Sequence, residues 1–358
     1  MMITSPPTEL NLRRFETNGG ASIFQIPLQL FPTLSGYAYL VLFDDPYLGR
    51  LRVLIDTGSG FGSSNQNLEK GLQAISTQIG EPITLDKLTH ILITHGHIDH
   101  FGGLSYVRSR TPAMIGVHEL DLRNLTHYEE RIAVVARRLN EFLTEAGVSE
   151  EQRFQMIELY KSTKSLYHSV RVDFTYEAIG MQLGPFEMLH VPGHCAGHVA
   201  IRLHNILFSG DHVLSQTSPH QSPERLTLST GLDHYLRSLD ILQAWAGDIP
   251  LTLGGHKEPI TNLPERIGEI RKLHSERLRR VLELFSVPRT IAQVSQQLFG
   301  EPEGYTALLA IEEAGAHVEY LYQRGMLGIQ NLAEIEQSDH STSIHYQQSS
   351  VPNFNSFI

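Results

Sequence analysis

Apolar runs and helical periods alternate along the first third of the chain, as they do in a mixed α/β protein. Short runs rich in β-branched and aromatic residues predict strands at 22–30, 37–43, 52–55, 91–93 and 113–117. Leu68, Leu72 and Ile75 recur at helical spacing and predict a helix over 67–79 with one buried face. Further strands are expected downstream, at 170–177, 181–183 and 186–191.

The pattern becomes helical and more charged between residues 120 and 169. Ile132, Val135, Leu139 and Phe142 fall on one stripe, and Ser149 with the residues after it forms a capping box that begins another helix. A stretch of about fifty residues is too long for an ordinary connection, so we interpret it as an inserted helical subdomain. It is either a structural buttress or a lid over a site. Its tyrosines are candidates for reaching such a site: Tyr128, Tyr160 and Tyr167.

The C-terminal part predicts a separate module. Helical periods at 264–285, 290–299 and 305–323 precede a brief strand at 325–329, an order that resembles a winged helix. The later helices carry many glutamates where a DNA-reading helix needs positive charge, so packing or dimerisation is favoured over nucleic-acid binding. From 334 onward the chain is polar and aperiodic, which predicts a disordered tail. The expected domains are therefore 1–262, 263–332 and 333–358.

Composition narrows the class of protein. The chain of 358 residues is 41% hydrophobic and 19% charged, as in ordinary globular proteins, and its formal charge of -11 speaks against a nucleic-acid partner. Cys195 is the single cysteine, so no internal disulfide can form, and we interpret it as a small buried filler. The first twenty residues lack a signal-peptide pattern, and no apolar run is long enough to span a membrane. We expect a cytoplasmic protein without a membrane partner.

Four residues of metal-binding types occur within six positions, directly after the strand at 91–93. Backbone that leaves a strand in an extended turn projects alternate side chains the same way, so His95 and His97 can converge on one cation. Asp99 and His100 follow, just before two glycines that let the chain turn into a helix, and they can face a second cation. A single pair of histidines would be weak support, but this spacing after an apolar strand is a strong signal.

Three later strand ends repeat the arrangement. The ligand types that end them are His194, Asp211 and His256. Each of these residues follows a glycine, where a close approach of the backbone is needed. One such strand end could arise by accident, whereas four together predict a metal site.

These motifs resemble the hydrolases of the metallo-β-lactamase superfamily, in particular its glyoxalase II-like and lactamase-β-like groups with a C-terminal winged helix. The resemblance covers about residues 22–262 and includes the I-D-T-G strand end at Asp56. It implies an α/β fold, a four-layer αβ/βα sandwich with a dinuclear site along one edge. By position, one metal would be bound by His95, His97 and His194, and the other by Asp99, His100 and His256. Asp211 would bridge them, and Asp56 would be a buried acid that fixes the metal loop.

The donor types themselves also suggest a chemistry. Imidazoles and carboxylates without a thiolate suit Zn(II) best and also accept Fe(II) or Mn(II). Two such cations, about 3.5–4 Å apart, would turn a shared water into hydroxide near neutral pH, and Asp99 would shuttle a proton. His198 is expected to pack or to form a hydrogen bond rather than to bind a metal. His118 is either a pocket residue or a helix cap, and His212 is expected to point away from the site.

Several functions fit this pattern. The leading hypothesis is a dinuclear metal-dependent hydrolase of a small ester, thioester or lactone, with a small-molecule substrate and a possible homodimer. The alternative is an endoribonuclease or phosphodiesterase of the lactamase-β-like type. A β-lactamase is less favoured because the fold hosts many chemistries. A non-enzymatic regulatory protein is disfavoured by the unbroken ligand set.

Overall fold

The structure is a computed structural model that describes residues 12–349. A seven-stranded sheet contains, in spatial as well as sequence order, β1 (Arg13–Glu16), β2 (Ser22–Phe31), β3 (Leu34–Asp45), β4 (Gly49–Ile55), β5 (His90–Leu92), β6 (Met114–Val117) and β7 (Phe174–Thr175). The first four strands pair antiparallel, and β4 to β7 pair in parallel. The parallel strands bring their carboxyl ends to one edge of the sheet.

A second, five-stranded sheet lies against the first. Its spatial order is β12 (Leu251–Gly254), β11 (Ile206–Gly210), β10 (Val199–Leu203), β9 (Phe186–His190) and β8 (Gln182–Leu183). The β11–β12 pair is parallel and the other pairs are antiparallel.

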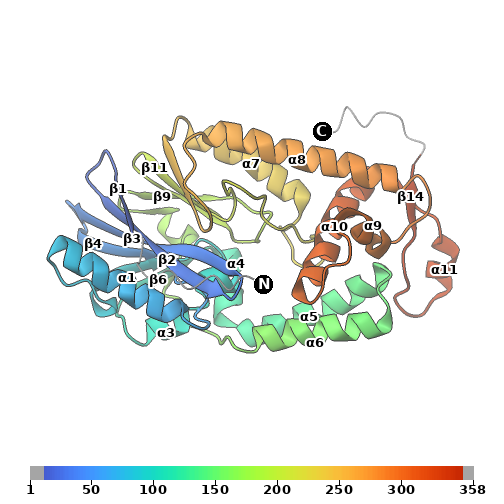
Figure 1. Ribbon diagram of the computed structural model, residues 1–358, viewed down its shortest axis with the longest axis horizontal. Helices are drawn as coiled ribbons and strands as arrows, with labels where there is room; N and C mark the ends of the chain where they lie inside the picture. The colour runs from blue at the N-terminus through green and yellow to red at the C-terminus, as the bar shows by residue number, and fades with distance from the viewer. Residues whose placement is uncertain (1–11, 350–358) are drawn as a thin grey trace, which may run out of the picture.

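Helices cover the outer faces of both sheets (Figure 1). The helices before the insertion are α1 (Ser64–Ile79), α2 (Ile98–Phe101) and α3 (Leu104–Arg108). The insertion contains α4 (Glu119–Thr126), α5 (Tyr128–Glu145) and α6 (Glu150–Lys164), and α7 (Leu232–Ala246) lies on the second sheet's side. The C-terminal elements are α8 (Leu263–Leu284), α9 (Ile291–Phe299), α10 (Tyr305–Gln323), β13 (Leu327–Ile329), α11 (Leu332–Gln337) and β14 (Tyr346–Gln348).

Three hydrophobic clusters account for the layers. Alternate residues of β3 belong to different clusters: Tyr39 and Val41 pack between the two sheets, whereas Ala38 and Leu40 face α1. The third cluster joins the outer face of the second sheet to α7, α8, the insertion and α10. Burial on both faces of each sheet is the physical basis of the predicted αβ/βα sandwich, and this prediction is confirmed.

The insertion and the C-terminal helices share one core. Phe142 of α5 and Leu308 of α10 are buried in the same cluster, together with residues of α8 and α9. Figure 1 shows α5 and α6 running beneath α10. The insertion is therefore packed as a fixed wall against the C-terminal module, which favours the buttress over a freely hinged lid.

Several expectations need adjustment. The strand predicted at 170–177 is only the two residues of β7, followed by a short 3₁₀ turn. The tail expected to be disordered from 333 contains α11 and β14, and β14 pairs with β13, so that prediction is wrong up to Gln348. Residues 350–358 of the tail lie outside the described part. The brief strand near 325–329 is confirmed as β13, while the winged-helix assignment and the domain limits stay predictions. Among the described helices, none is long and apolar enough to cross a membrane.

Candidate metal centre

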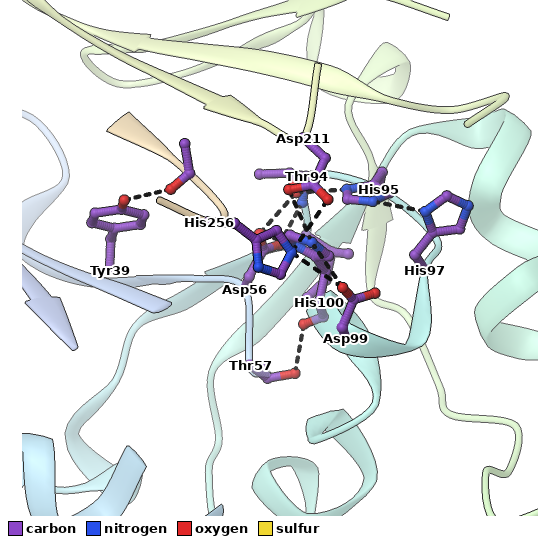
Figure 2. Close-up of polar contacts among 12 residues, drawn as sticks. Tyr39, Asp56, Thr57, Thr94, His95, His97, Asp99, His100, Asp211 and His256 are labelled. Atoms are coloured by element: carbon purple, nitrogen blue, oxygen red, sulfur yellow. Dashed lines mark hydrogen bonds and ion pairs between the residues drawn. The ribbon is translucent and has the colours of Figure 1, made fainter. Parts of the chain in front are cut away.

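Seven predicted ligand residues come together where the strands of both sheets end, and Figure 2 labels all of them except His194. Their donor atoms form two groups, each with all its atoms within 4.8 Å of one another. The first group consists of His95, His97 and His194, and the second of Asp99, His100, Asp211 and His256. The grouping is the one that the resemblance implied, except that Asp211 falls with the second group.

The first group is built from two loops. His95 Nε2 lies 3.1 Å from His97 Nδ1, as expected for two imidazoles that leave β5 on the same side. The His194 ring N–H at Nδ1 donates to the carbonyl of His220 at 2.7 Å, and its Nε2 is buried without a hydrogen-bond partner among the described residues. Burial lowers the pKa of all three imidazoles, so they are held neutral with a lone pair available to a cation.

The second group is rich in carboxylate. His256 Nε2 lies 3.2 Å from Asp99 Oδ2 and 3.3 Å from Asp211 Oδ2. His100 Nε2 lies 3.3 Å from Asp211 Oδ1, while His194 Nε2 of the first group is 3.9 Å from Asp211 Oδ2. Asp211 thus faces imidazoles of both groups and occupies the place of a bridging ligand.

Hydrogen bonds at Nδ1 orient the imidazoles. His100 donates from Nδ1 to Asp56 Oδ2 at 2.7 Å, and His256 donates from Nδ1 to the carbonyl of Ser35 at 2.8 Å. With His194, this makes three ligands whose Nδ1 is occupied and whose Nε2 points into the site. Such partners fix the tautomer of metal-binding histidines and increase their basicity.

Asp56 organises the loop that carries four of the ligands. Its Oδ1 accepts from the Thr94 backbone N–H at 2.8 Å, and its Oδ2 accepts from the Thr94 hydroxyl at 2.8 Å as well as from His100. The residue is almost fully buried and adopts a left-handed backbone with φ of 59°. The expected buried acid beneath the metal loop is therefore where the sequence motif placed it.

Close backbone approach explains two of the glycines that precede ligands. A Cβ on Gly255 would lie 2.5 Å from Asp211 Oδ1 and 2.5 Å from a carbon of the His100 ring. A Cβ on Gly193 would lie 2.4 Å from the Tyr235 backbone, and its φ of +133° disfavours any other residue. Larger residues at these positions would displace the ligands that follow them.

The charge balance of the site fits a cation. Among residues 12–349, Asp99 and Asp211 form ion pairs only with histidines. Burial acts to lower the pKa of His256, yet Asp211 and Asp99 raise it to about 10. The two carboxylates thus favour a positive charge between them. Three donor atoms are also buried without hydrogen-bond partners in the described structure: His100 Nε2, His194 Nε2 and Asp211 Oδ1. This is expected of atoms whose partner is a bound cation.

Other histidines singled out from the sequence have structural roles. His198 accepts a hydrogen bond at Nε2 from the Asp211 backbone N–H at 3.1 Å, and so supports a ligand without belonging to either group. His118 caps α4 by accepting from the Leu120 N–H, which favours the cap over a pocket role. His212 packs against Tyr235 and belongs to neither group, as expected.

Cys195 is buried beside Asp121, with its sulfur 3.2 Å from a carboxylate oxygen. Burial and that carboxylate raise the pKa of the thiol, so it is held protonated as an unreactive filler. Asp121, which the sequence did not single out, also accepts from the Gly96 N–H at 2.7 Å and steadies the turn between His95 and His97.

A third cluster, His274, Glu313 and His317, also has donor atoms within 4.8 Å of one another, but its atoms are already paired. His274 Nδ1 lies 3.1 Å from His317 Nε2, and His274 Nε2 lies 2.7 Å from the Ser218 hydroxyl. Glu313 forms an ion pair with Arg277, whose charge opposes a bound cation. The cluster is a hydrogen-bonded link between α8, α10 and a loop near the metal centre.

That loop, residues 218–222, ties the C-terminal module to the site. Glu313 Oε2 accepts from the Gln221 N–H at 2.7 Å, and Glu312 Oε2 lies 3.0 Å from His220 Nε2. Because the His220 carbonyl holds His194, α10 indirectly positions a candidate ligand. These contacts are invisible in local sequence patterns, since they join segments about ninety residues apart.

Comparison with known proteins agrees with this geometry. A family model described as the metallo-beta-lactamase superfamily matches residues 33–284. The chain is 23% identical over 247 residues to the lactamase-like protein aptB of Emericella nidulans, a match that covers 68% of this chain and 60% of that protein. It is 25% identical over 271 residues to the lactamase-like protein nscB of Arthroderma otae, covering 72% and 63% respectively. The chain therefore spans less than two thirds of these relatives.

A shorter match and two solved structures extend the comparison. A hydroxyacylglutathione hydrolase of Stenotrophomonas maltophilia is 29% identical over 129 residues, 36% of this chain and 34% of that one. A metallo-beta-lactamase family protein from Thermus thermophilus superposes with a TM-score of 0.71 at 24% identity, covering 91% of this chain and 98% of that chain. A beta-lactamase domain protein from Burkholderia ambifaria gives 0.66 at 21% identity, covering 94% of each. These two likenesses show the fold alone.

Proposed function

The chain belongs to the metallo-β-lactamase superfamily, and on that premise we propose that it is a metal-dependent hydrolase of small thioesters or esters. The observation that carries this proposal is the geometry of the two donor groups: Asp211 of the second group faces an imidazole of each group, and three imidazoles are held by bonds at Nδ1. Such a set of imidazoles and carboxylates suits Zn(II), Fe(II) or Mn(II).

In this proposal His95, His97 and His194 hold one cation, Asp99, His100 and His256 hold a second, and Asp211 lies between them. Bound divalent cations supply a nucleophilic hydroxide at neutral pH and polarise the oxygen of a substrate carbonyl. The protein's own part is to fix the ligands. Asp56, the Ser35 carbonyl and the His220 carbonyl do this by occupying Nδ1 of three ligands.

Asp99 is the carboxylate that we assign to proton transfer. Its side chain is 16% exposed, against 10% for Asp211 and 4% for Asp56, so it is the acid of the site most open to substrate. In this role it accepts a proton at a carboxylate oxygen as water attacks and returns it to the leaving thiolate or alkoxide. The partial match to a hydroxyacylglutathione hydrolase supports an acylated thiol as the substrate class.

The rival function, cleavage of RNA, finds little support in α10. Glu312, Glu313 and Glu319 of this helix all bond to the loop of residues 220–224, so they brace that loop. A helix that directs acidic side chains at its own protein, in a chain with a formal charge of -11, does not offer the basic surface that phosphates require.

Chelation tests the proposal. We expect treatment with a chelator to abolish hydrolysis of a panel of small thioesters, and add-back of Zn(II), Fe(II) or Mn(II) to restore it. Asp99→Asn should lower kcat by at least about a hundredfold, in the range of a lost general acid–base group. The matched control is Asp86→Asn, which removes an exposed carboxylate outside the donor groups. Hydrolysis that survives chelation would refute the proposal, and metal-dependent cleavage of single-stranded RNA without thioester hydrolysis would replace it by the rival.

A further inference from the structure

Asp121 joins the two loops that carry the first donor group. It lies in α4, the first helix of the insertion, and its side chain is buried. Its Oδ2 accepts from the Gly96 N–H at 2.7 Å, and the Cys195 sulfur lies 3.3 Å from Oδ1 and 3.2 Å from Oδ2. Gly96 separates the first two imidazoles of the group, and Cys195 directly follows the third. One carboxylate therefore contacts both segments that supply the three imidazoles.

Glycines let both loops approach this carboxylate closely. A Cβ on Gly96 would lie 3.0 Å from Asp121 Cγ and 2.6 Å from Asn124 Nδ2. A Cβ on Gly197, in the second loop, would lie 2.7 Å from Asp121 Cγ and 2.7 Å from its backbone nitrogen. A larger residue at Gly197 would thus displace Asp121 or the loop.

The contacts of the carboxylate are with neutral donors. Its Oδ1 also accepts from Asn124 Nδ2 at 2.8 Å, one turn later in α4. Among residues 12–349, Asp121 forms no ion pair with lysine, arginine or histidine. Burial of a carboxylate without a counter-ion is unfavourable unless donors satisfy its oxygens, and an apolar residue would fill the space at a lower cost. The donors that Asp121 serves therefore indicate its role, and two of them come from the loops of the donor group.

Asp121 fixes the part of the two loops that their other direct link leaves free. That link is the bond from the Val199 N–H to the Thr94 carbonyl, at 2.9 Å, which lies before the first ligand of the group. It does not constrain the spacing between His97 and His194, whose ring centroids are 4.5 Å apart. Asp121 holds the residue before His97 and the residue after His194, so it sets this spacing directly.

Asp56 provides a parallel on the other side of the site. It accepts from the Thr94 N–H and from His100, a member of the second donor group. Asp121 makes no contact with that group among the described residues, and Asp56 makes none with Gly96 or with the loop after His194. Each donor group is therefore supported by its own buried acid.

We propose that Asp121 is a positioning residue for a cation bound by His95, His97 and His194, and that it sets the metal affinity of this group separately from the second group. The inference rests on the proposed function, which assigns a cation to this group. Asp121 does not touch the cation. It holds the two loops so that the three imidazoles are already close together before a metal binds, and supporting partners of this kind change metal affinity about 10–100-fold.

The test is a competition titration of metal-free protein with Zn(II) against a chromophoric chelator. His97→Ala and His256→Ala show which binding step belongs to each donor group. Asp121→Ala should weaken the His97-dependent step about 10–100-fold and leave the His256-dependent step nearly unchanged. Asp121→Asn keeps one oxygen that accepts from the Gly96 N–H, but its NH₂ group cannot accept from Cys195. It should weaken the same step about three- to tenfold, the size of one lost hydrogen bond, and it decides the outcome if the alanine variant does not fold.

Asp173→Ala is the matched control. The Asp173 side chain is 6% exposed and also accepts a backbone N–H, that of Ile115, at 2.9 Å, but it lies outside both donor groups. Its replacement should lower the melting temperature without weakening either Zn(II) binding step. The comparison separates loss of a buried carboxylate in general from loss of the one that holds the ligand loops.

The possible results discriminate between the inference and the proposed function. An unchanged His97-dependent step in folded Asp121 variants, or equal weakening of both steps, would overturn the inference while the hydrolase proposal stands. Two wild-type binding steps without hydrolysis of any thioester or ester would overturn the proposed function and leave the role of Asp121 intact. Zn(II) binding that does not depend on His97 would overturn both.

Discussion

Replacement of Asp56 by asparagine should weaken metal binding without unfolding the protein. Asparagine keeps the shape of the side chain and tolerates the left-handed backbone, with φ of 59°, that most residues avoid. With Oδ1 still accepting from the Thr94 N–H, the new NH₂ group takes the place of Oδ2. It then faces the His100 N–H at a distance of 2.7 Å, so that two donors oppose each other.

His100 can relieve this conflict only by moving its proton. The ring must release the proton at Nδ1 to accept from the asparagine, which transfers the proton to Nε2. Nε2 is the atom that faces Asp211 and that we assign to the metal, and once protonated it can no longer bind a cation. Mutation of such supporting partners costs about 10–100-fold in metal affinity, equivalent to roughly 1.4–2.8 kcal/mol.

The assay is a competition titration of metal-free protein with Zn(II) against a chromophoric chelator. We expect one of two binding steps to weaken by the stated factor in Asp56→Asn, while the melting temperature of the metal-free protein changes little. Asp44→Asn is the control, since it makes the same change on a side chain that is 78% exposed. If a correctly folded Asp56→Asn protein binds Zn(II) in two steps with the affinities of the wild type, Asp56 does not have the assigned role. The proposal that Asp56 orients His100 for metal binding would then be refuted as well.

Two further predictions concern the supports of His194. Gly193→Ala should lower the free energy of unfolding by at least about 2 kcal/mol, because its Cβ would meet the Tyr235 backbone at 2.4 Å. The control Gly268→Ala, whose Cβ would meet no atom within 4 Å, should be neutral or stabilising. Equal denaturation midpoints for the two variants would contradict this prediction. Burial acts to lower the pKa of His220, but its two glutamate partners on α10 raise it to about 9. The charged form therefore stabilises the fold fully below pH 6.5, and this contribution, roughly 3 kcal/mol, is lost as the pH rises through 9. The stability difference between wild type and His220→Gln, measured by denaturation at pH 6 and pH 10, should shrink accordingly, and a difference independent of pH would contradict it.

The metal-ligand constellation was predictable because each part of it is local. A ligand placed just past an apolar strand depends only on the alternation of side chains and on a turn, both of which are encoded within a few residues. His95 and His97 follow β5 in this way, and Asp211 follows β11. Convergence of four strand ends then follows from the layered fold, since the parallel strands share one edge.

The supports of these ligands were not predictable in the same way. The bond from His194 to the His220 carbonyl has no sequence signature, because a backbone acceptor leaves no residue type to recognise. Glu312 and Glu313 were noted only as negative charges that disfavour nucleic acid, although both brace the loop beside the site. Their direction depends on how α10 packs on α8, which pattern analysis cannot supply.

Edge elements were missed for a different reason. β1 consists of Arg13–Glu16, a mostly polar strand at the edge of the first sheet, and its burial alternates only between intermediate and exposed. It has too few apolar residues for its pattern to distinguish it from a polar segment without a strand. β14 is likewise a short strand with one buried residue, Tyr346, inside a segment whose composition predicted disorder. Pairing with a neighbour, which the sequence does not reveal, gives both segments their structure.

The C-terminal module is thereby part of the site. Phe142 of the insertion and Leu308 of α10 are buried in the same cluster. α10 also holds the loop of residues 218–222, whose carbonyl orients His194. Because the same buried cluster joins α5, α6 and α10, the insertion and the helix that braces His194 are one packed unit. We therefore expect a substitution in this core to disturb the loop that holds His194, whereas a change on the outer face of α1 should not.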